Sequence, residues 1–316
     1  MNQSRELSAG KRRGLQVTAN DEALFTILAI DHADDMRVTI RPDDFESVTH
    51  EEVVAVKARL MRQLAPIVSA VLVDPVYGLA PAVLQDALPG STGLMLCIED
   101  GNFASPQRPS RTVDGWSVGQ IKKAGGAAVK VYFHYHPDDR NLAQAQEAFV
   151  AELVEECRHF DLPLFAEPIS YGVSGAERRR VVLESGRRFS QMGADVLKAE
   201  FPLDIQAEQD EALWEQACRE LSEAIAIPWV LLSAGVDFET FERQLRAACK
   251  GGASGYLAGR AIWKDGMMLD GQGQEAFLRE TAVARLQALT GLVNKYGRPW
   301  TNFYTASKVA KEWYKE

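Results

Sequence analysis

Residues 195–202 read DVLKAEFP, a short apolar run with a segment of helical composition before it (175–192) and another after it (205–225). Side chains along a strand point alternately to opposite faces, so Leu197 and Phe201 share one face and Lys198 lies on the other. The same unit, an apolar run that ends in polar residues and leads into a helical segment, recurs along the chain. Its eight copies begin with the runs 25–31, 70–75, 93–100, 127–135, 163–170, 195–202, 228–235 and 255–263.

Alternating strands and helices are typical of a parallel sheet, and eight such units predict an α/β protein with a (β/α)8 TIM barrel. A doubly wound open sheet is the alternative, but no GxGxxG segment follows the first run. No linker divides the chain, so we expect a single domain with an N-terminal capping segment (1–24) and a C-terminal helical tail (264–316). Helices are expected at 50–68, 141–160, 175–192, 205–225, 238–250 and 274–296.

The composition excludes several classes of protein. A formal net charge of -9 disfavours nucleic-acid binding, because contact with the phosphate backbone requires a basic surface. The four cysteines form no CxxC pair, which argues against a zinc knuckle and a secreted disulfide scaffold. No apolar run reaches bilayer length and no signal peptide is visible, so we expect a cytoplasmic protein without a membrane partner. The sequence is compatible with a homo-oligomer.

Four charged residues fall on the inward face of four predicted strands. If the alternate apolar residues pack on the outer helices, Lys130, Glu167 and Lys198 point into the barrel, and Asp31 does so at the end of the first strand. A purely structural ion network is the alternative explanation, yet stability alone is served better by aliphatic residues. Because catalytic groups of such barrels lie at the carboxyl ends of strands, these four are candidate catalytic residues.

This set of residue types suits Schiff-base chemistry. A lysine is a nucleophile only as the free amine, and burial beside a second cation favours that form. Lys198 is therefore the candidate nucleophile, with Lys130 as the neighbouring cation that also positions substrate. Glu167 is the candidate for proton transfer, and Asp31 for deprotonating a substrate hydroxyl. The imine acts as the electron sink for C–C cleavage, so no cofactor is expected.

The last two strands point to a phosphate site. Ser233 and Gly235 follow the seventh run, and Gly259 and Arg260 lie near the end of the eighth. Small residues let backbone N–H groups approach an anion, and the loops after strands seven and eight of such barrels often bind phosphate. Arg260 would add a charged clamp. A helix cap or a glycine needed for packing would explain either segment as well.

Histidines are the remaining candidates. His32, beside Asp31, is expected as a binding residue at the rim of the site rather than as a base. His134 and His136 have the spacing of two metal ligands on one strand face. No third ligand is evident and the sequence resembles a strand running into a turn, so no metal site is expected.

With these residues placed, the chain resembles the tagatose-bisphosphate aldolase family of class I aldolases, and it is similar to the related sulfofructosephosphate aldolases. The resemblance implies a TIM barrel with the Schiff-base lysine at Lys198 and the acid/base glutamate at Glu167, and it assigns the phosphate of a dihydroxyacetone-phosphate half to the SAG and GR segments. The matching segments are LAID (28–31), LVDPVYG (72–78), WSVGQIKKAGGAAVKV (116–131), LPLFAEPISY (162–171), DVLKAEFP (195–202), PWVLLSAGV (228–236) and ASGYLAGRAIW (253–263). The implied reaction is cleavage of a phosphorylated ketose, such as tagatose 1,6-bisphosphate, to dihydroxyacetone phosphate and an aldehyde.

The run after Asp31 departs from the family pattern, which commonly has a Gln-Arg pair there. His32 and Ala33 take those places, followed by Asp34 and Asp35. Two carboxylates would repel a second anion and would suit hydroxyl groups instead. Unless Arg37 or His134 replaces the missing cation, the aldehyde half is expected to be uncharged, as in a ketose 1-phosphate aldolase.

Two other functions fit the same barrel, because a fold does not fix chemistry. One is a metal-dependent aldolase or a sugar-phosphate isomerase, for which sensitivity to EDTA would be the sign. The other is a non-catalytic protein that binds sugar phosphates, for which binding without turnover would be the sign.

Overall fold

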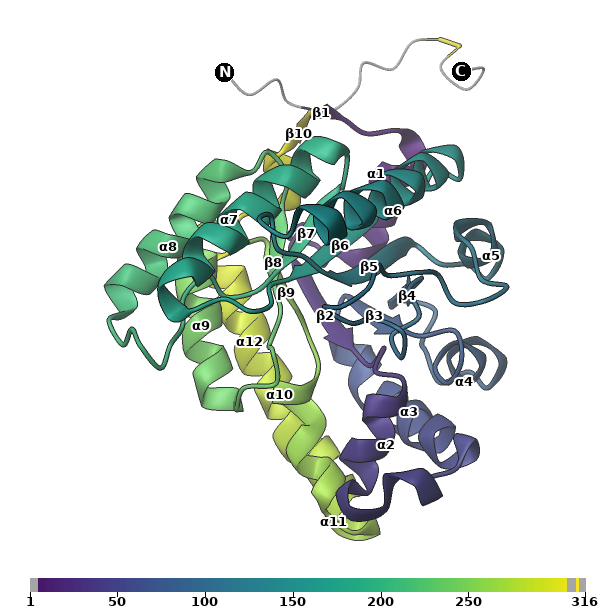
Figure 1. Cartoon of the computed structure of the whole chain (residues 1–316). Coiled ribbons are helices and arrows are strands. Elements are labelled where there is room, and N and C mark those ends of the chain that lie inside the picture. Colours follow the sequence, from purple (N-terminus) through teal and green to yellow (C-terminus); the bar gives the residue numbers. More distant parts are fainter. Residues whose placement is uncertain (1–4, 306–310, 313–316) are drawn as a thin grey trace.

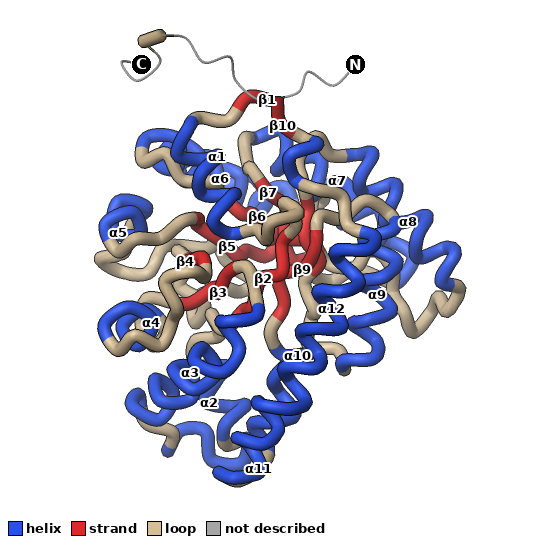
Figure 2. Tube along the Cα trace, turned by 180° about the vertical axis from the view of Figure 1, so that it is seen from behind, coloured by secondary structure: helices blue, strands red, loops and turns tan. Residues whose placement is uncertain are grey.

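The computed structural model describes residues 5–305 and 311–312. Eight parallel strands form a closed barrel in the order in which they occur in the chain, and the last strand pairs with the first. Figure 2 shows these strands at the centre of the molecule with helices around them. The strands are β2 (Phe25–Ala29), β3 (Ala70–Val73), β4 (Gly93–Cys97), β5 (Ala128–His134), β6 (Leu164–Ile169), β7 (Val196–Ala199), β8 (Trp229–Leu231) and β9 (Gly255–Ala258). The predicted TIM barrel is confirmed.

Helices cover the outside of the barrel (Figure 1). Helix α9 illustrates why they form: the Asp237 side chain accepts a hydrogen bond from the Thr240 N–H at its start, and Phe241 and Leu245 are fully buried on one face. The helices are α1 (Ala9–Thr18), α2 (Asp34–Ile40), α3 (His50–Leu64), α4 (Leu79–Leu84), α5 (Val118–Lys123), α6 (Arg140–His159), α7 (Gly175–Met192), α8 (Glu211–Ala224), α9 (Phe238–Lys250), α10 (Arg260–Trp263), α11 (Gly271–Ala276) and α12 (Val283–Tyr296).

The two faces of each strand belong to two separate apolar clusters. On β7, Val196 packs in the barrel interior with Phe25 and Phe165, whose rings lie 5.6 Å apart, whereas Leu197 packs outward under the helices. The next inward position after Val196 is Lys198. Apolar side chains therefore fill the barrel interior towards the amino ends of the strands. The charged inward residues follow them at the carboxyl ends.

The amino end of the barrel is covered by both ends of the described chain. Leu15 of α1 packs in the same interior cluster as Trp300 and Tyr304. Strands β1 (Arg5–Glu6) and β10 (Tyr304–Thr305) pair beside them, at the top of Figure 1. This arrangement leaves the opposite, carboxyl end of the barrel open. The C-terminal helix predicted at 274–296 is present as continuous helical structure that ends with α12 at Tyr296, and a 3-10 turn and β10 follow it.

The predicted eighth strand (255–263) is wrong in its second half. Strand β9 ends at Ala258, and Arg260–Trp263 form the short helix α10. The reason is a tertiary contact: the Trp263 indole N–H donates to the Ala29 carbonyl at 3.1 Å, and a Cβ on Gly259 would collide with that same carbonyl. None of the helices in the described ranges has the length and apolar composition needed to cross a bilayer.

Candidate active site

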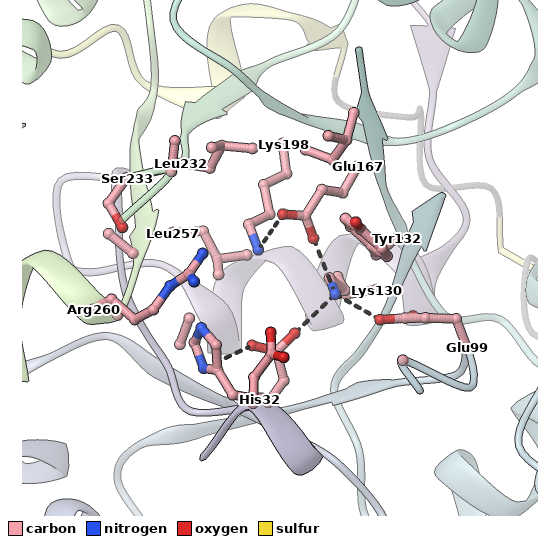
Figure 3. Close-up of a pocket in the computed structure, with 18 of the residues that line it drawn as sticks. His32, Glu99, Lys130, Tyr132, Glu167, Lys198, Leu232, Ser233, Leu257 and Arg260 are labelled. Carbon is pink, nitrogen blue, oxygen red and sulfur yellow. Dashed lines mark hydrogen bonds and ion pairs between the residues drawn. The ribbon is translucent and has the colours of Figure 1, made fainter. Parts of the chain in front are cut away.

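A cavity of about 330 Å³ opens at the carboxyl ends of the strands (Figure 3). The sequence-predicted residues that line it are Asp31, His32, Lys130, Glu167, Lys198, Ser233, Gly259 and Arg260. Gly235 lies directly behind, where a Cβ would stand 3.4 Å from Arg260 Cζ. The structure thus brings residues from six strand ends to one place. This follows from the barrel itself, because parallel strands deliver their carboxyl ends to the same rim.

Lys130 is enclosed by three carboxylates. Its Nζ lies 2.8 Å from Asp31 Oδ2, 2.6 Å from Glu99 Oε1 and 2.9 Å from Glu167 Oε2, and the residue is 3% exposed. Burial by itself disfavours the cation, but the carboxylates outweigh it and raise the pKa of Lys130 well above its ordinary value. Lys130 is therefore a permanent cation at the centre of the site.

Glu167 joins the two lysines. Its Oε1 lies 2.7 Å from Lys198 Nζ, while its Oε2 faces Lys130. Glu167 and Lys198 are 6% and 5% exposed, so bulk water reaches neither freely. Glu167 thus contacts the buried Lys198 nitrogen through one oxygen and the fixed Lys130 cation through the other. This position allows it to exchange a proton with Lys198.

Asp31 is held as an anion. Burial alone would raise its pKa, but the cations of Lys130 and Lys198 outweigh burial and hold the pKa of Asp31 well below its usual range. Asp31 therefore stands beside the two lysines in the form that accepts a proton.

Glu99 is a site residue that the sequence analysis missed. It follows β4, is 4% exposed and pairs with Lys130. Burial and the neighbouring Asp31 charge raise its pKa, against the opposing effect of Lys130. The signal was present: in GLMLCIED, Met95, Cys97 and Glu99 alternate, which places Glu99 on the inward face like the other charged residues.

Asp31, Cys97 and Glu99 are the one group in the described chain with three potential metal-ligand atoms within 4.8 Å of one another. Two of them contact the Lys130 ammonium, and burial raises the pKa of the Cys97 thiol well above its ordinary value. A metal thiolate would have to form beside a fixed cation, so this donor set does not suit a metal ion.

The opposite side of the cavity holds Ser233 and Arg260 (Figure 3). In the described ranges no carboxylate lies within 4.0 Å of the Arg260 guanidinium, so its charge is free for a ligand. The chain turns through Ala234 (φ 48°) and Gly235 (φ 78°) just after β8. A glycine suits this left-handed conformation and leaves room for the guanidinium beside it.

The residues that follow Asp31 diverge in direction. Asp35 lines the cavity, whereas Asp34 accepts a hydrogen bond from the Tyr77 hydroxyl at 3.0 Å, away from it. Arg37 donates to the same hydroxyl at 3.1 Å and does not line the cavity. His134, considered above as a substitute cation, is also absent from the cavity wall.

The His32 ring packs edge-on against Trp263, with the two ring centroids 5.3 Å apart, and its side chain is 17% exposed. Burial, together with the nearby cations of Arg260, Lys57 and Lys198, lowers the pKa of His32 to about 3, although the Asp31 charge opposes this shift. His32 is therefore a neutral imidazole at pH 7, able to accept or donate a hydrogen bond without adding charge.

We expect the free energy of unfolding to fall as the pH is lowered from 6.5 towards 4. The unfolded chain binds a proton on His32 near pH 6.5, whereas the folded chain does so only near pH 3, so acid favours unfolding by about 1.4 kcal/mol per pH unit from this one group. Urea denaturation at several pH values would measure the slope, with His32→Gln as the variant and His159→Gln, on an exposed turn of α6, as the control. An unchanged slope in His32→Gln would contradict the assignment.

Comparison with known proteins agrees with this architecture. The family model of the DeoC/LacD family aldolases matches residues 25–265. A tagatose 1,6-diphosphate aldolase of Enterococcus faecalis is 31% identical, over 92% of this chain and 94% of its own length. One from Listeria monocytogenes is 30% identical, over 95% of this chain and 96% of its own.

Solved structures show the same fold. A Schiff-base-forming fructose-1,6-bisphosphate aldolase has a TM-score of 0.61 at 19% identity, and the match covers 89% of this chain and 98% of that one. A fructose-bisphosphate aldolase from Slackia heliotrinireducens has a TM-score of 0.61 at 12% identity, with coverage of 96% and 92%. The family match spans all eight barrel strands and every charged residue gathered at their carboxyl ends; the chain belongs to the DeoC/LacD family of aldolases.

Proposed function

We propose that this protein is a class I aldolase that cleaves a phosphorylated ketose, such as tagatose 1,6-bisphosphate, to dihydroxyacetone phosphate and an aldehyde. The observation that carries the proposal is the Lys198–Glu167–Lys130 contact, in which one carboxylate joins two buried lysines. Arg260 stands across the cavity, and no carboxylate of the described residues pairs with it. The tagatose 1,6-diphosphate aldolases among its relatives support the substrate class.

The first steps use Lys198 and Glu167. Glu167, 2.7 Å from Lys198 Nζ, takes one proton from the Lys198 ammonium, and the amine that remains attacks the C2 carbonyl of the ketose and forms a carbinolamine. Glu167 then gives that proton to the departing hydroxyl, so that water leaves and an iminium ion forms. The fixed cation of Lys130 on the far oxygen of Glu167 keeps this carboxylate oriented towards the nitrogen.

The bond-breaking step uses Asp31. Its carboxylate takes the proton of the C4 hydroxyl, the C3–C4 bond breaks as the aldehyde carbonyl forms, and the electron pair moves through C2 to the iminium nitrogen. Asp31 then gives this proton to C3 of the resulting enamine, and hydrolysis of the iminium ion releases dihydroxyacetone phosphate and the Lys198 ammonium. Lys130, 2.8 Å from Asp31, stabilises negative charge on the C4 oxygen as it loses its proton.

The phosphate on C1 would bind at Arg260, Ser233 and the turn at Gly235, on the side of the cavity across from Lys130. Replacing Arg260 by alanine is expected to raise KM about 10- to 100-fold for a phosphorylated ketose, because a charge-assisted contact to phosphate is lost. Arg260→Lys should recover part of the loss. Steady-state cleavage kinetics measure this, with Arg59→Ala on α3 as the control; an unchanged KM in Arg260→Ala would contradict the phosphate assignment.

The proposed function is tested by coupling release of dihydroxyacetone phosphate to NADH oxidation through glycerol-3-phosphate dehydrogenase. We expect ketose phosphates to be cleaved at the same rate with and without EDTA, because the amine supplies the electron sink. Binding of ketose phosphates without cleavage, or loss of cleavage in EDTA, would overturn the proposal. Phosphorylated sugars do not cross a bilayer unaided, which supports the cytoplasmic location expected from the sequence.

A further inference from the structure

A buried ion pair lies close to the site and has no part in the proposed reaction. Lys57 of α3 is completely buried, and its ammonium contacts the carboxylate of Asp74, which follows β3 directly and is 3% exposed. Neither residue lines the cavity. A buried ion pair often stabilises a fold no more than apolar residues of the same volume, because both charges lose their hydration. This pair is better explained by the geometry that it fixes.

The pair fixes the turn that follows β3. Asp74 Oδ1 accepts hydrogen bonds from the Val76 N–H at 2.9 Å and the Tyr77 N–H at 2.7 Å, while Oδ2 contacts Lys57. Lys57 Nζ also lies 5.5 Å from the centre of the Tyr77 ring, and the His50 ring packs on the same ring with the centroids 5.1 Å apart. Tyr77 is 6% exposed. Its ring is thereby held from the backbone and from α3.

The Tyr77 hydroxyl joins this turn to α2. It donates a hydrogen bond to the Asp34 carboxylate at 3.0 Å and accepts one from the Arg37 guanidinium at 3.1 Å. Asp34 is the first residue of α2, and Arg37 lies one turn later. A helix of seven residues has little stability of its own, so contacts with its surroundings decide where it lies. Figure 1 shows α2 beside α3, the helix that carries Lys57.

Helix α2 begins three residues after Asp31. The Lys130 ammonium holds the Asp31 carboxylate from inside the barrel at 2.8 Å, and the Tyr77 hydroxyl holds the chain on the other side, at Asp34. Proton transfer from the C4 hydroxyl requires the two oxygens to lie within about 2.6–3.2 Å. A misplacement of about 1 Å can cost about 100-fold in rate. A shift of α2 would therefore reach the reaction through Asp31.

We propose that Tyr77 is a positioning residue for C–C cleavage. Lys57 and Asp74 hold its ring, and its hydroxyl fixes segment 31–34 so that the Asp31 carboxylate meets the C4 hydroxyl of the ketose. Tyr77 itself does not line the cavity. This inference rests on the proposed aldolase function and adds to it a residue that acts without touching the substrate.

Other elements hold the Schiff-base half of the site. Lys198 lies on β7, Glu167 on β6 and Arg260 at the start of α10, and α2 carries none of them. The Tyr77 hydroxyl should therefore matter for cleavage and not for imine formation at Lys198. This difference separates a positioning role from a general loss of structure, which would slow both steps.

Tyr77→Phe removes the hydroxyl and keeps the ring. We expect kcat for ketose cleavage to fall by about tenfold, because Asp31 is less well placed. The rate at which dihydroxyacetone phosphate is trapped on Lys198 by borohydride should stay within about twofold of the wild-type rate, because Asp31 takes no part in that step. An unchanged kcat, or an equal fall in cleavage and in trapping, would show that Tyr77 is not a positioning residue.

Tyr135→Phe is the matched control. Tyr135 is 3% exposed, donates a hydrogen bond to the Glu147 carboxylate at 2.7 Å and does not line the cavity. The variant loses a buried hydroxyl of the same kind, and its kcat should stay within about twofold of the wild-type value. If Tyr135→Phe lowers kcat as much as Tyr77→Phe does, loss of any buried tyrosine hydroxyl has the same effect and the inference is wrong.

Asp34 tests the same contact from the side of α2. Its side chain is 52% exposed, so replacing it should not prevent folding. Asp34→Ala should lower kcat in the same direction as Tyr77→Phe, and the two changes together should cost little more than Tyr77→Phe alone. Asp34→Asn keeps an oxygen that accepts the hydrogen bond and should retain most of the activity. Fully additive losses, or an equal loss in Asp34→Asn and Asp34→Ala, would contradict the inference.

Failure of the inference and failure of the proposed function give different results. If the wild-type protein forms the Lys198 adduct and cleaves ketose phosphates, but Tyr77→Phe cleaves them at the wild-type rate, the inference is wrong and the aldolase mechanism stands. If the wild-type protein forms no adduct, the proposed function is wrong and the role of Tyr77 falls with it.

Discussion

Lys198→Met is expected to abolish ketose cleavage, with a loss in kcat of at least about 10⁴-fold, because a thioether cannot form the imine that carries the reaction. The fold should survive. Glu167 loses one partner but still contacts Lys130 at 2.9 Å, so its buried charge is not left uncompensated. Cleavage is measured by the coupled release of dihydroxyacetone phosphate, and circular dichroism checks the fold.

The matched control is Lys123→Met, which removes an exposed lysine in the last turn of α5 and should leave the rate within about twofold. A folded Lys198→Met protein that retained a substantial fraction of wild-type cleavage would contradict the assignment of the nucleophile.

Glu167→Gln should lower kcat by about 10²- to 10⁴-fold, the range lost when a general acid/base is removed. The amide cannot take or return a proton, although its oxygen still accepts a hydrogen bond from one of the two lysines. We expect the rate of imine formation to fall in proportion to kcat, since the carbinolamine steps depend on this carboxyl. Stopped-flow kinetics and the steady-state rate are compared for the same preparation.

The control is Glu200→Gln. Glu200 also lines the cavity, but it pairs with Arg178 at 2.9 Å and accepts a hydrogen bond from the Ser170 N–H at 2.7 Å. We expect this variant to lose less than about tenfold in kcat. A larger loss in Glu200→Gln than in Glu167→Gln would move the proton-transfer role from one carboxylate to the other.

Strand periodicity was enough to predict the inner face of this barrel. Two-residue alternation in DVLKAEFP places Lys198 inward because Leu197 packs under the helices, and the structure has both residues as predicted. The same rule identifies Glu99, yet it was missed because GLMLCIED was interpreted only as an apolar strand. A local pattern is sufficient wherever the barrel pleat alone decides the direction of a side chain.

The parts that local pattern did not predict depend on contacts between distant segments. The short helix α10 forms where the Trp263 indole reaches the Ala29 carbonyl of β2, more than 200 residues earlier in the chain. Asp34 and Asp35 are neighbours in sequence, but Asp34 accepts a hydrogen bond from the Tyr77 hydroxyl, whereas Asp35 lines the cavity. Sequence periodicity carries no information about such partners, which the closed barrel brings together.

The most direct test is to incubate the wild-type protein with dihydroxyacetone phosphate, reduce with sodium borohydride, and map the modified peptide by mass spectrometry. The mechanism predicts one stable adduct, on the ε-nitrogen of Lys198, together with irreversible loss of cleavage activity. Full activity after this treatment, or an adduct on Lys130 in place of Lys198, would contradict it.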